Sequence, residues 1–213
     1  MFNPESPPEL SVAQWFNATE PLLLGGLKGK VVMLVAFHMR CSGSLKHALP
    51  QAQRLARTFN SEEVAIIGLH MEFEDHKNMK PGLLEPFIKQ EQISIPIAVD
   101  APNGGGLPKT MDAYGMQGTP TLLLFDRQGR LRRHYLGAAD DVRISAEIMA
   151  LALEPPNAPR EVSMAIEQQL ASALIDPTGH EHEHSADCCG AHHDHGQDHD
   201  HTREQGRGCC DKH

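Results

Sequence analysis

The stretch that decides the fold is Val31-Val-Met-Leu-Val-Ala-Phe37, which His38-Met-Arg40 connects to Cys41. A continuous apolar run rich in valine is typical of a strand that is covered on both faces within a parallel sheet. Behind the cysteine, apolar residues recur at helical spacing over residues 42–59, with Pro50 as an expected kink. The sequence therefore predicts a buried strand, a cysteine and a helix in direct succession.

The remaining periodic segments alternate between strands and helices. Together with the first strand and helix, they give the order βαβαβ up to residue 99, which favours parallel pairing. A later pair of apolar runs flanks the turn-forming residues Asp126-Arg-Gln-Gly129. We therefore expect an α/β domain with a central mixed sheet flanked by helices. The expected strands are residues 64–70, 93–99, 121–126 and 131–136, and the expected helices are residues 81–90, 108–114 and 140–153.

The composition argues against several classes of protein. A net charge of −9 and a pI near 5.8 provide no basic face for nucleic acid. The apolar run Val31–Phe37 is far shorter than the roughly 20 residues that cross a bilayer, so we expect no membrane partner. Residues 1–10 lack the basic and apolar regions of a secretory signal, and this predicts a cytoplasmic protein.

Composition also divides the chain into four parts. We expect an N-terminal extension over residues 1–14, one domain over 15–153, a linker with an amphipathic helix over 154–176, and a tail over 177–213. The amphipathic pattern is compatible with packing on the domain and with self-association. From Pro177 onward the chain has no Val, Ile, Leu, Met or aromatic residue, so we expect the tail to be disordered.

Four motifs together resemble a known family. Leu27-Lys-Gly-Lys-Val-Val precedes the first strand, Cys41-Ser-Gly-Ser44 follows it, and Gly118-Thr-Pro-Thr121 and Asp126-Arg-Gln-Gly129 come later. Over residues 15–153 the combination resembles the TlpA-type, redoxin-like branch of thioredoxin-like proteins. That resemblance implies a thioredoxin-like fold and a thiol-disulfide oxidoreductase or antioxidant activity.

The resemblance also implies roles for individual residues, with one departure. Cys41 would begin a helix and face a cis-proline at Pro120, and Thr119 and Pro120 would bind the substrate backbone. The family's Cys-x-x-Cys ends here in Ser44, so dithiol cycling within the motif is impossible. Val35 replaces the buried acid that thioredoxins carry six residues before the cysteine.

We expect Cys41 to be the nucleophile of this site. Unpaired N–H groups at a helix N-terminus lower a thiol pKa from about 8.5 to below about 7.5. Arg40 would add a positive charge, and Ser44 would donate a hydrogen bond to the sulfur. A lone thiolate permits attack on a glutathione mixed disulfide, attack on a protein disulfide, or oxidation to sulfenic acid. In the alternative, Cys41 is an inert buried residue.

The sequence also argues against a peroxiredoxin-type site. A peroxiredoxin would carry Pro-x-x-x-Thr-x-x-Cys, but Leu34 and His38 stand at the matching positions, so a typical peroxidatic site is not expected. His38 and His47 are interpreted as structural. The domain itself requires no cofactor, and its expected partners are protein or small-molecule thiols and disulfides.

The tail concentrates metal-ligating side chains. Imidazole and thiolate suit Zn²⁺, Ni²⁺ and copper, and adjacent cysteines match no structural zinc module, so we expect a loose site for one or more ions. The competing function is therefore metal binding or delivery on a non-catalytic scaffold, and a merely solubilising tail is the third alternative. The candidate ligands are His180, His182, His184, Cys188, Cys189, His192, His193, His195, His199, His201, Cys209 and Cys210.

The tail cysteines are also candidates for the resolving thiol that Ser44 does not provide. These are Cys188, Cys189, Cys209 and Cys210. A flexible segment of about 35 residues spans about 30 to 35 Å, which exceeds the radius of gyration of about 14 Å expected for the domain. The tail is therefore long enough to reach Cys41.

Overall fold

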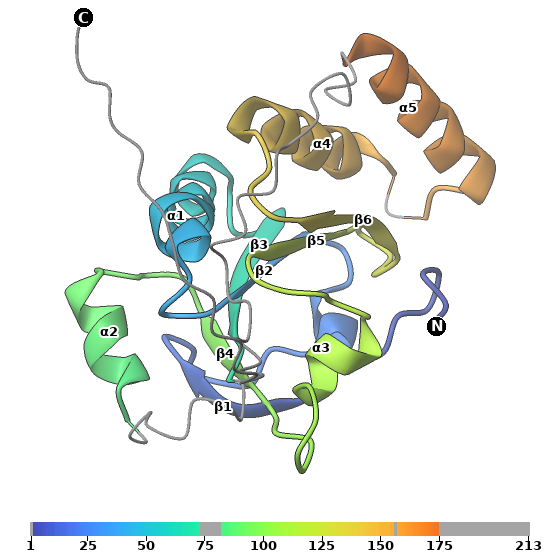
Figure 1. Cartoon of the computed structure of the whole chain (residues 1–213). Helices are drawn as coiled ribbons and strands as arrows, with labels where there is room; N and C mark the ends of the chain where they lie inside the picture. The colour runs from blue at the N-terminus through green and yellow to red at the C-terminus, as the bar shows by residue number, and fades with distance from the viewer. Residues whose placement is uncertain (1, 73–81, 156, 175–213) are drawn as a thin grey trace, which may run out of the picture. The chain divides into compact units, whose positions relative to one another are not determined.

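The computed structural model describes residues 2–72, 82–155 and 157–174, and within them one mixed sheet organises the chain (Figure 1). The sheet has six strands in the order β1-β4-β3-β2-β5-β6. The strands are β1 (Val12–Phe16), β2 (Val31–Phe37), β3 (Val64–His70), β4 (Ile97–Asp100), β5 (Thr121–Phe125) and β6 (Leu131–Leu136). The expected α/β architecture with a mixed sheet is confirmed.

Strand directions follow from the connections. β2, β3 and β4 run parallel because helical segments connect them, and β5 and β6 form the expected antiparallel hairpin, with β5 also antiparallel to β2. β1 pairs antiparallel with β4 and was not predicted from the sequence. The sheet thus begins at Val12, three residues before the expected domain start, and Leu10 is already buried in the core.

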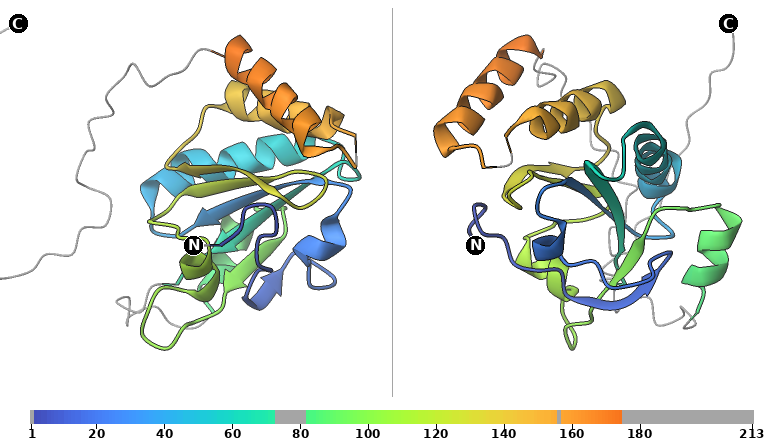
Figure 2. Two further views of the ribbon diagram at one scale, coloured as in Figure 1. Left: turned by 90° about the vertical axis from the view of Figure 1, so that its right-hand side faces the viewer. Right: turned by 180° about the vertical axis from the view of Figure 1, so that it is seen from behind.

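Helices cover both faces of the sheet (Figure 2). Alternate residues of β2 divide the core, because Met33 and Val35 pack with one cluster while Leu34 and Ala36 pack with the other. The first cluster includes residues of α1 (Leu49–Thr58), α2 (Leu84–Gln90) and α4 (Asp141–Leu153). The second includes residues of α3 (Lys109–Ala113) and of the 3-10 helix η1 (Leu24–Leu27).

The helix after the cysteine is continuous but not uniform. Its first part is a π-helix, η2 (Ser44–Ala48), in which the Leu49 N–H bonds to the Ser44 carbonyl, and α1 continues from there. Pro50 has no N–H and would crowd the carbonyl four residues earlier in a regular α-helix. The wider π turn before Pro50 relieves that conflict, so the irregularity expected at this proline takes the form of a π turn.

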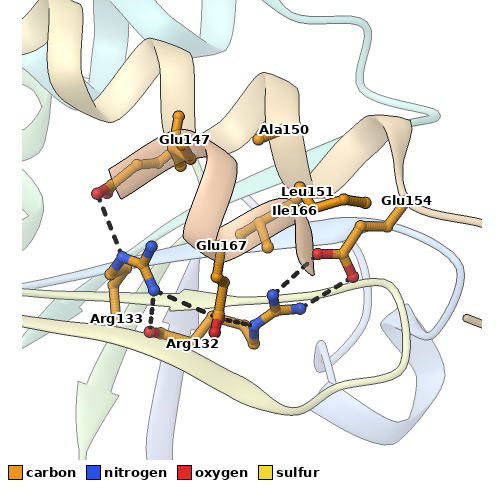
Figure 3. A pocket seen from close by; sticks show the side chains of 9 residues that line it. Arg132, Arg133, Glu147, Ala150, Leu151, Glu154, Ile166 and Glu167 are labelled. Carbon is orange, nitrogen blue, oxygen red and sulfur yellow. Dashed lines mark hydrogen bonds and ion pairs between the residues drawn. The ribbon is translucent and has the colours of Figure 1, made fainter. Parts of the chain in front are cut away.

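Helix α5 (Arg160–Ala173) packs on the domain, which is the first of the two alternatives left open by its pattern (Figure 3). The side chain of Arg132 in β6 is 1 % exposed and binds the carboxylates of Asp126, Glu154 and Glu167 at 2.5 to 3.0 Å. The Ser163 hydroxyl of α5 also donates to Glu154 at 2.9 Å. Buried ion pairs therefore attach α5 to the hairpin and to the end of α4.

Two local expectations differ from the structure. β4 begins at Ile97 rather than at residue 93, because the Asn17 amide binds the carbonyls of Ile93 and Ile95 at 2.8 and 3.1 Å. The helix expected over 81–90 is α2, which begins at Leu84, and Pro81 lies outside the described residues.

Over the part of the chain that the structure describes, no helix has both the length and the apolar character needed to cross a bilayer.

Candidate active site

Cys41 occupies the turn between β2 and the helix. Its N–H donates to the carbonyl of His38, and its own carbonyl accepts from the N–H of Leu45, both at 3.0 Å. The residue is 3 % exposed and is the free cysteine of the described chain. The position at the beginning of a helix, predicted from the sequence, is confirmed.

The sulfur faces the loop that precedes β5. The peptide bond between Thr119 and Pro120 is cis, as the resemblance implied, and the Cys41 thiol donates to the Thr119 carbonyl at 3.1 Å. Gly43 contributes to this close approach, because a Cβ atom there would lie 3.2 Å from Pro120 Cδ and 3.9 Å from the sulfur. The structure therefore brings together Cys41, Ser44, Thr119 and Pro120 from two distant segments.

The environment of Cys41 favours the thiolate. Burial raises the pKa of Cys41, but hydrogen bonds from the Ser44 side chain and N–H, from Thr119 and from the Gly43 N–H outweigh it, so the net direction is downward. The Ser44 hydroxyl is fully buried and makes no hydrogen bond of standard geometry with any residue described. In the protonated form, the Cys41 thiol donates to the Thr119 carbonyl instead. On ionisation, however, the hydroxyl is free to rotate and donate.

Arg40 does not lower the pKa of Cys41 as the sequence predicted. Its side chain is exposed, and it is not among the groups that shift the pKa of Cys41. Val35 is fully buried within an apolar cluster, so no carboxylate lies at that position beneath the cysteine. The proton released by Cys41 therefore has no acidic relay at this position.

A pair of histidines lies at the ends of β2 and β3. The His38 and His70 rings stack with centroids 5.7 Å apart, and both residues are buried. Burial and then the neighbouring His38 lower the pKa of His70 to about 3, so it stays neutral. Neither histidine is among the groups that shift the pKa of Cys41, which supports the structural interpretation of His38.

A polar pocket of about 220 Å³ lies on the side of the helix that begins at Cys41. Residues 138–141, after β6, form its other wall, and the preceding Gly137 donates its N–H to the Pro120 carbonyl at 2.8 Å. The lining residues are Lys46, His47, Gln51, Arg54, Ala138, Ala139, Asp140 and Asp141. Sequence reasoning missed this pocket, although the spacing of His47, Gln51 and Arg54 places them on one helical face.

The expected metal and resolving residues of the tail, His180 to Cys210, lie outside the described residues. Within residues 2–72, 82–155 and 157–174, no group of three or more His, Cys, Asp or Glu side chains is arranged to hold a metal ion.

Sequence reasoning also missed Gly43, since only its packing against Pro120 reveals its role.

Comparison with known proteins supports the assignment of the fold. No protein-family model and no curated protein matches the chain. Among solved structures, the thioredoxin-like superfamily protein SPOA0173 is 43% identical with a TM-score of 0.68, and the match covers 71% of this chain and 97% of that one. A thiol-disulfide isomerase from Corynebacterium glutamicum is 39% identical with a TM-score of 0.67, covering 71% of this chain and 98% of that one.

A more distant structure shares the fold alone. It is a thiol:disulfide interchange protein DsbE from Chlorobium tepidum, 22% identical with a TM-score of 0.54, and the match covers 69% of this chain and 99% of that one. The two solved structures that share 43% and 39% of their residues with this chain are matched over almost their whole length. The chain therefore belongs to the thioredoxin-like superfamily.

Proposed function

We propose that this protein is a monothiol thiol-disulfide oxidoreductase in which Cys41 is the nucleophile. The Cys41 thiolate attacks one sulfur of a disulfide, a bond forms between the two sulfurs, and the original S–S bond breaks. The departing thiolate takes a proton from water. Cys41 ends oxidised in a mixed disulfide, and one half of the substrate is reduced.

The observation that carries this proposal is the placement of the sulfur. It lies 3.1 Å from the Thr119 carbonyl beside the cis-proline, and hydrogen bonds from Ser44 and Gly43 favour its ionised form. An inert core cysteine would be surrounded by apolar side chains, which raise a thiol pKa. The name of the thiol-disulfide isomerase that is 39% identical to this chain supports the same reaction class.

Ser44 limits the reaction to its first half. Because an alcohol cannot take part in disulfide exchange, a second thiol must open the mixed disulfide. A small-molecule thiol and the tail cysteines are the two sources that we propose. An antioxidant role would use the same thiolate: attack on a peroxide oxygen gives sulfenic acid and releases water or an alcohol.

The test uses the full-length chain with the four tail cysteines replaced by serine, so that Cys41 is the sole thiol. Alkylation with iodoacetamide across pH gives the pKa of Cys41, and mass spectrometry after exposure to a small disulfide detects its adduct. We expect a pKa below that of an ordinary cysteine thiol and a single adduct that disappears in Cys41→Ser. A pKa above about 8.5 without an adduct would support an inert cysteine instead.

We also propose that residues 177–213 bind a divalent metal ion such as Zn²⁺, Ni²⁺ or copper. Nine of the fourteen histidines and four of the five cysteines lie in this segment, and both side chains are preferred ligands of these metals. Equilibrium dialysis of the full chain against a chain ending at Asp176 tests it. If metal binding disappears while the Cys41 adduct still forms, the two functions are independent. Equal binding by both chains would exclude the tail as the site.

A further inference from the structure

The acidic and the basic side chains of the pocket beside the Cys41 helix differ in whether they already have partners. Asp141 accepts from Gln51 Nε2 at 2.7 Å and from Arg54 Nη2 at 2.6 Å. The Asp140 carboxylate accepts from the N–H groups of Val142 and Arg143 at 3.0 and 2.9 Å, at the start of α4. Both acidic side chains of the pocket are therefore already engaged by neighbouring donors.

The basic side chains nearest to Cys41 are not engaged in this way. Lys46 and His47 are exposed and make no hydrogen bond or ion pair with any residue that the structure describes. Arg54 lies at the other end and is held by Asp141. A ligand in the pocket thus meets a free ammonium group, an imidazole and a wall in which Asp141 is paired with Arg54 and Asp140 is hydrogen-bonded to the start of α4.

The pocket is also placed to receive part of a molecule bonded to Cys41. Lys46 and His47 follow the cysteine by five and six residues in the same helical segment, a distance of about 8 to 9 Å along the axis. Three extended residues, the length of a tripeptide, span about 10 Å. The flanking residues of a small cysteine-containing peptide therefore reach from the sulfur into the pocket.

Its walls are suited to a polar occupant of this size. Ala138 and Ala139 leave the space open on one side, and Gln51, which is 3 % exposed, fixes that wall by donating to the Ala139 carbonyl at 2.7 Å. The wall connects through Gly137 to the Pro120 carbonyl beside the reacting sulfur. The pocket wall and the loop that faces the thiol are thus joined by a hydrogen bond.

We infer that this pocket recognises the carboxylate-bearing portion of a small anionic disulfide, such as a cysteine-containing peptide, during attack by Cys41. The inference rests on the proposed oxidoreductase function and specifies its substrate class. Lys46 attracts the substrate carboxylate, and the His47 imidazole lines the pocket beside it. The chemistry at sulfur is the exchange described above, in which one half of the disulfide stays on Cys41 and the other leaves as a thiolate.

The test compares three disulfides of different charge on the full-length chain with serine at the four tail cysteines. Oxidised glutathione is anionic, bis(2-hydroxyethyl) disulfide is neutral and cystamine is cationic. The rate of adduct formation at Cys41 is measured by mass spectrometry in Lys46→Gln, Lys46→Glu and the parent. Each variant is reported as the ratio of its oxidised glutathione rate to its neutral-disulfide rate, because this ratio cancels any change in the pKa of Cys41.

We expect Lys46→Gln to lower the ratio about two- to fivefold, the range of an exposed ion pair, and Lys46→Glu to lower it further while favouring cystamine. The difference should shrink as salt is added. Arg57→Gln is the matched control, since it removes one charge from the exposed face of α1 without lining the pocket, and its ratio should not change.

Three outcomes would overturn the inference. An unchanged ratio in both Lys46 variants would show that the pocket does not distinguish disulfides by their charge. An equal fall in Arg57→Gln would assign the effect to net charge. Absence of any adduct with all three disulfides would refute the proposed function and the inference with it, whereas adducts without charge preference would refute the inference alone.

Discussion

The Ser44→Ala variant provides the most direct test of how the site activates its cysteine. Ser44 is fully buried, and its hydroxyl is the largest of the hydrogen-bonding contributions that lower the pKa of Cys41. A hydrogen bond to a charged group contributes about 1.5 to 3 kcal/mol, and about 1.4 kcal/mol corresponds to one pKa unit. We therefore expect the pKa of Cys41 to rise by about 1 unit, or up to about 2.

The effect on rate changes sign with pH. A thiolate of higher pKa is intrinsically more nucleophilic, with a Brønsted coefficient of about 0.4 to 0.5. For a rise of about 1 unit, the variant should react about threefold more slowly at pH values below both pKa values, because less thiolate is present. Above both values it should react about threefold faster, because each thiolate is the stronger nucleophile.

Alkylation rates with iodoacetamide, measured across pH on the chain with serine at the four tail cysteines, give both quantities in one experiment. Ser42→Ala is the matched control because Ser42 is exposed in the same turn. Its profile should superimpose on that of the parent. Profiles of Ser44→Ala that do not cross, or a pKa that stays constant or falls, would refute the role assigned to the hydroxyl.

Three other substitutions test the rest of the structure. Ser44→Cys should restore an internal disulfide with Cys41, detected as protection of both thiols from alkylation after oxidation, and a free thiol pair would contradict the placement of the side chains. Arg132→Met should cost about 3 to 5 kcal/mol in the free energy of unfolding, because the buried Glu154 carboxylate loses its closest cation and keeps Arg130 at 3.8 Å. Adding Glu154→Leu should recover part of the loss in urea titrations followed by Trp15 fluorescence. The pKa of His70 in the folded protein is about 3, against 6.5 for the free side chain, so stability should be lost as pH falls through this window by up to about 1.4 kcal/mol per unit. His70→Leu should reduce that slope, and an unchanged slope would assign it to other groups.

The turn that carries Cys41 could be predicted because its signals are local. The apolar run of β2, the cysteine and the helical periodicity behind it are adjacent in sequence, and the cis-proline follows from a short motif in the resemblance. Each of these features is confirmed in the structure. Local periodicity and one motif therefore sufficed for the elements that hold Cys41.

Features that depend on distant pairing were not predictable in the same way. β1 is a five-residue strand whose partner, β4, lies more than eighty residues later, and its mixed composition carries no clear alternation. In β6, the side chain of Arg132 is buried against carboxylates from the end of α4 and from α5. Such interactions exist only after the helices have packed, so neither element shows them by itself.

The same hydrogen bonds that activate Cys41 also govern the second half of the exchange. A thiol of lowered pKa is a better leaving group, so an incoming thiol that attacks the substrate sulfur of the mixed disulfide expels Cys41 readily. With a second cysteine at position 44, internal attack on the Cys41 sulfur would compete with this release. Because Ser44 removes that competitor while keeping a donor beside the sulfur, the site favours exchange of one thiol partner for another over the formation of an internal disulfide. The identity of the incoming thiol then determines the direction of the reaction, and the unengaged Lys46 beside the site gives the protein a means to select an anionic one.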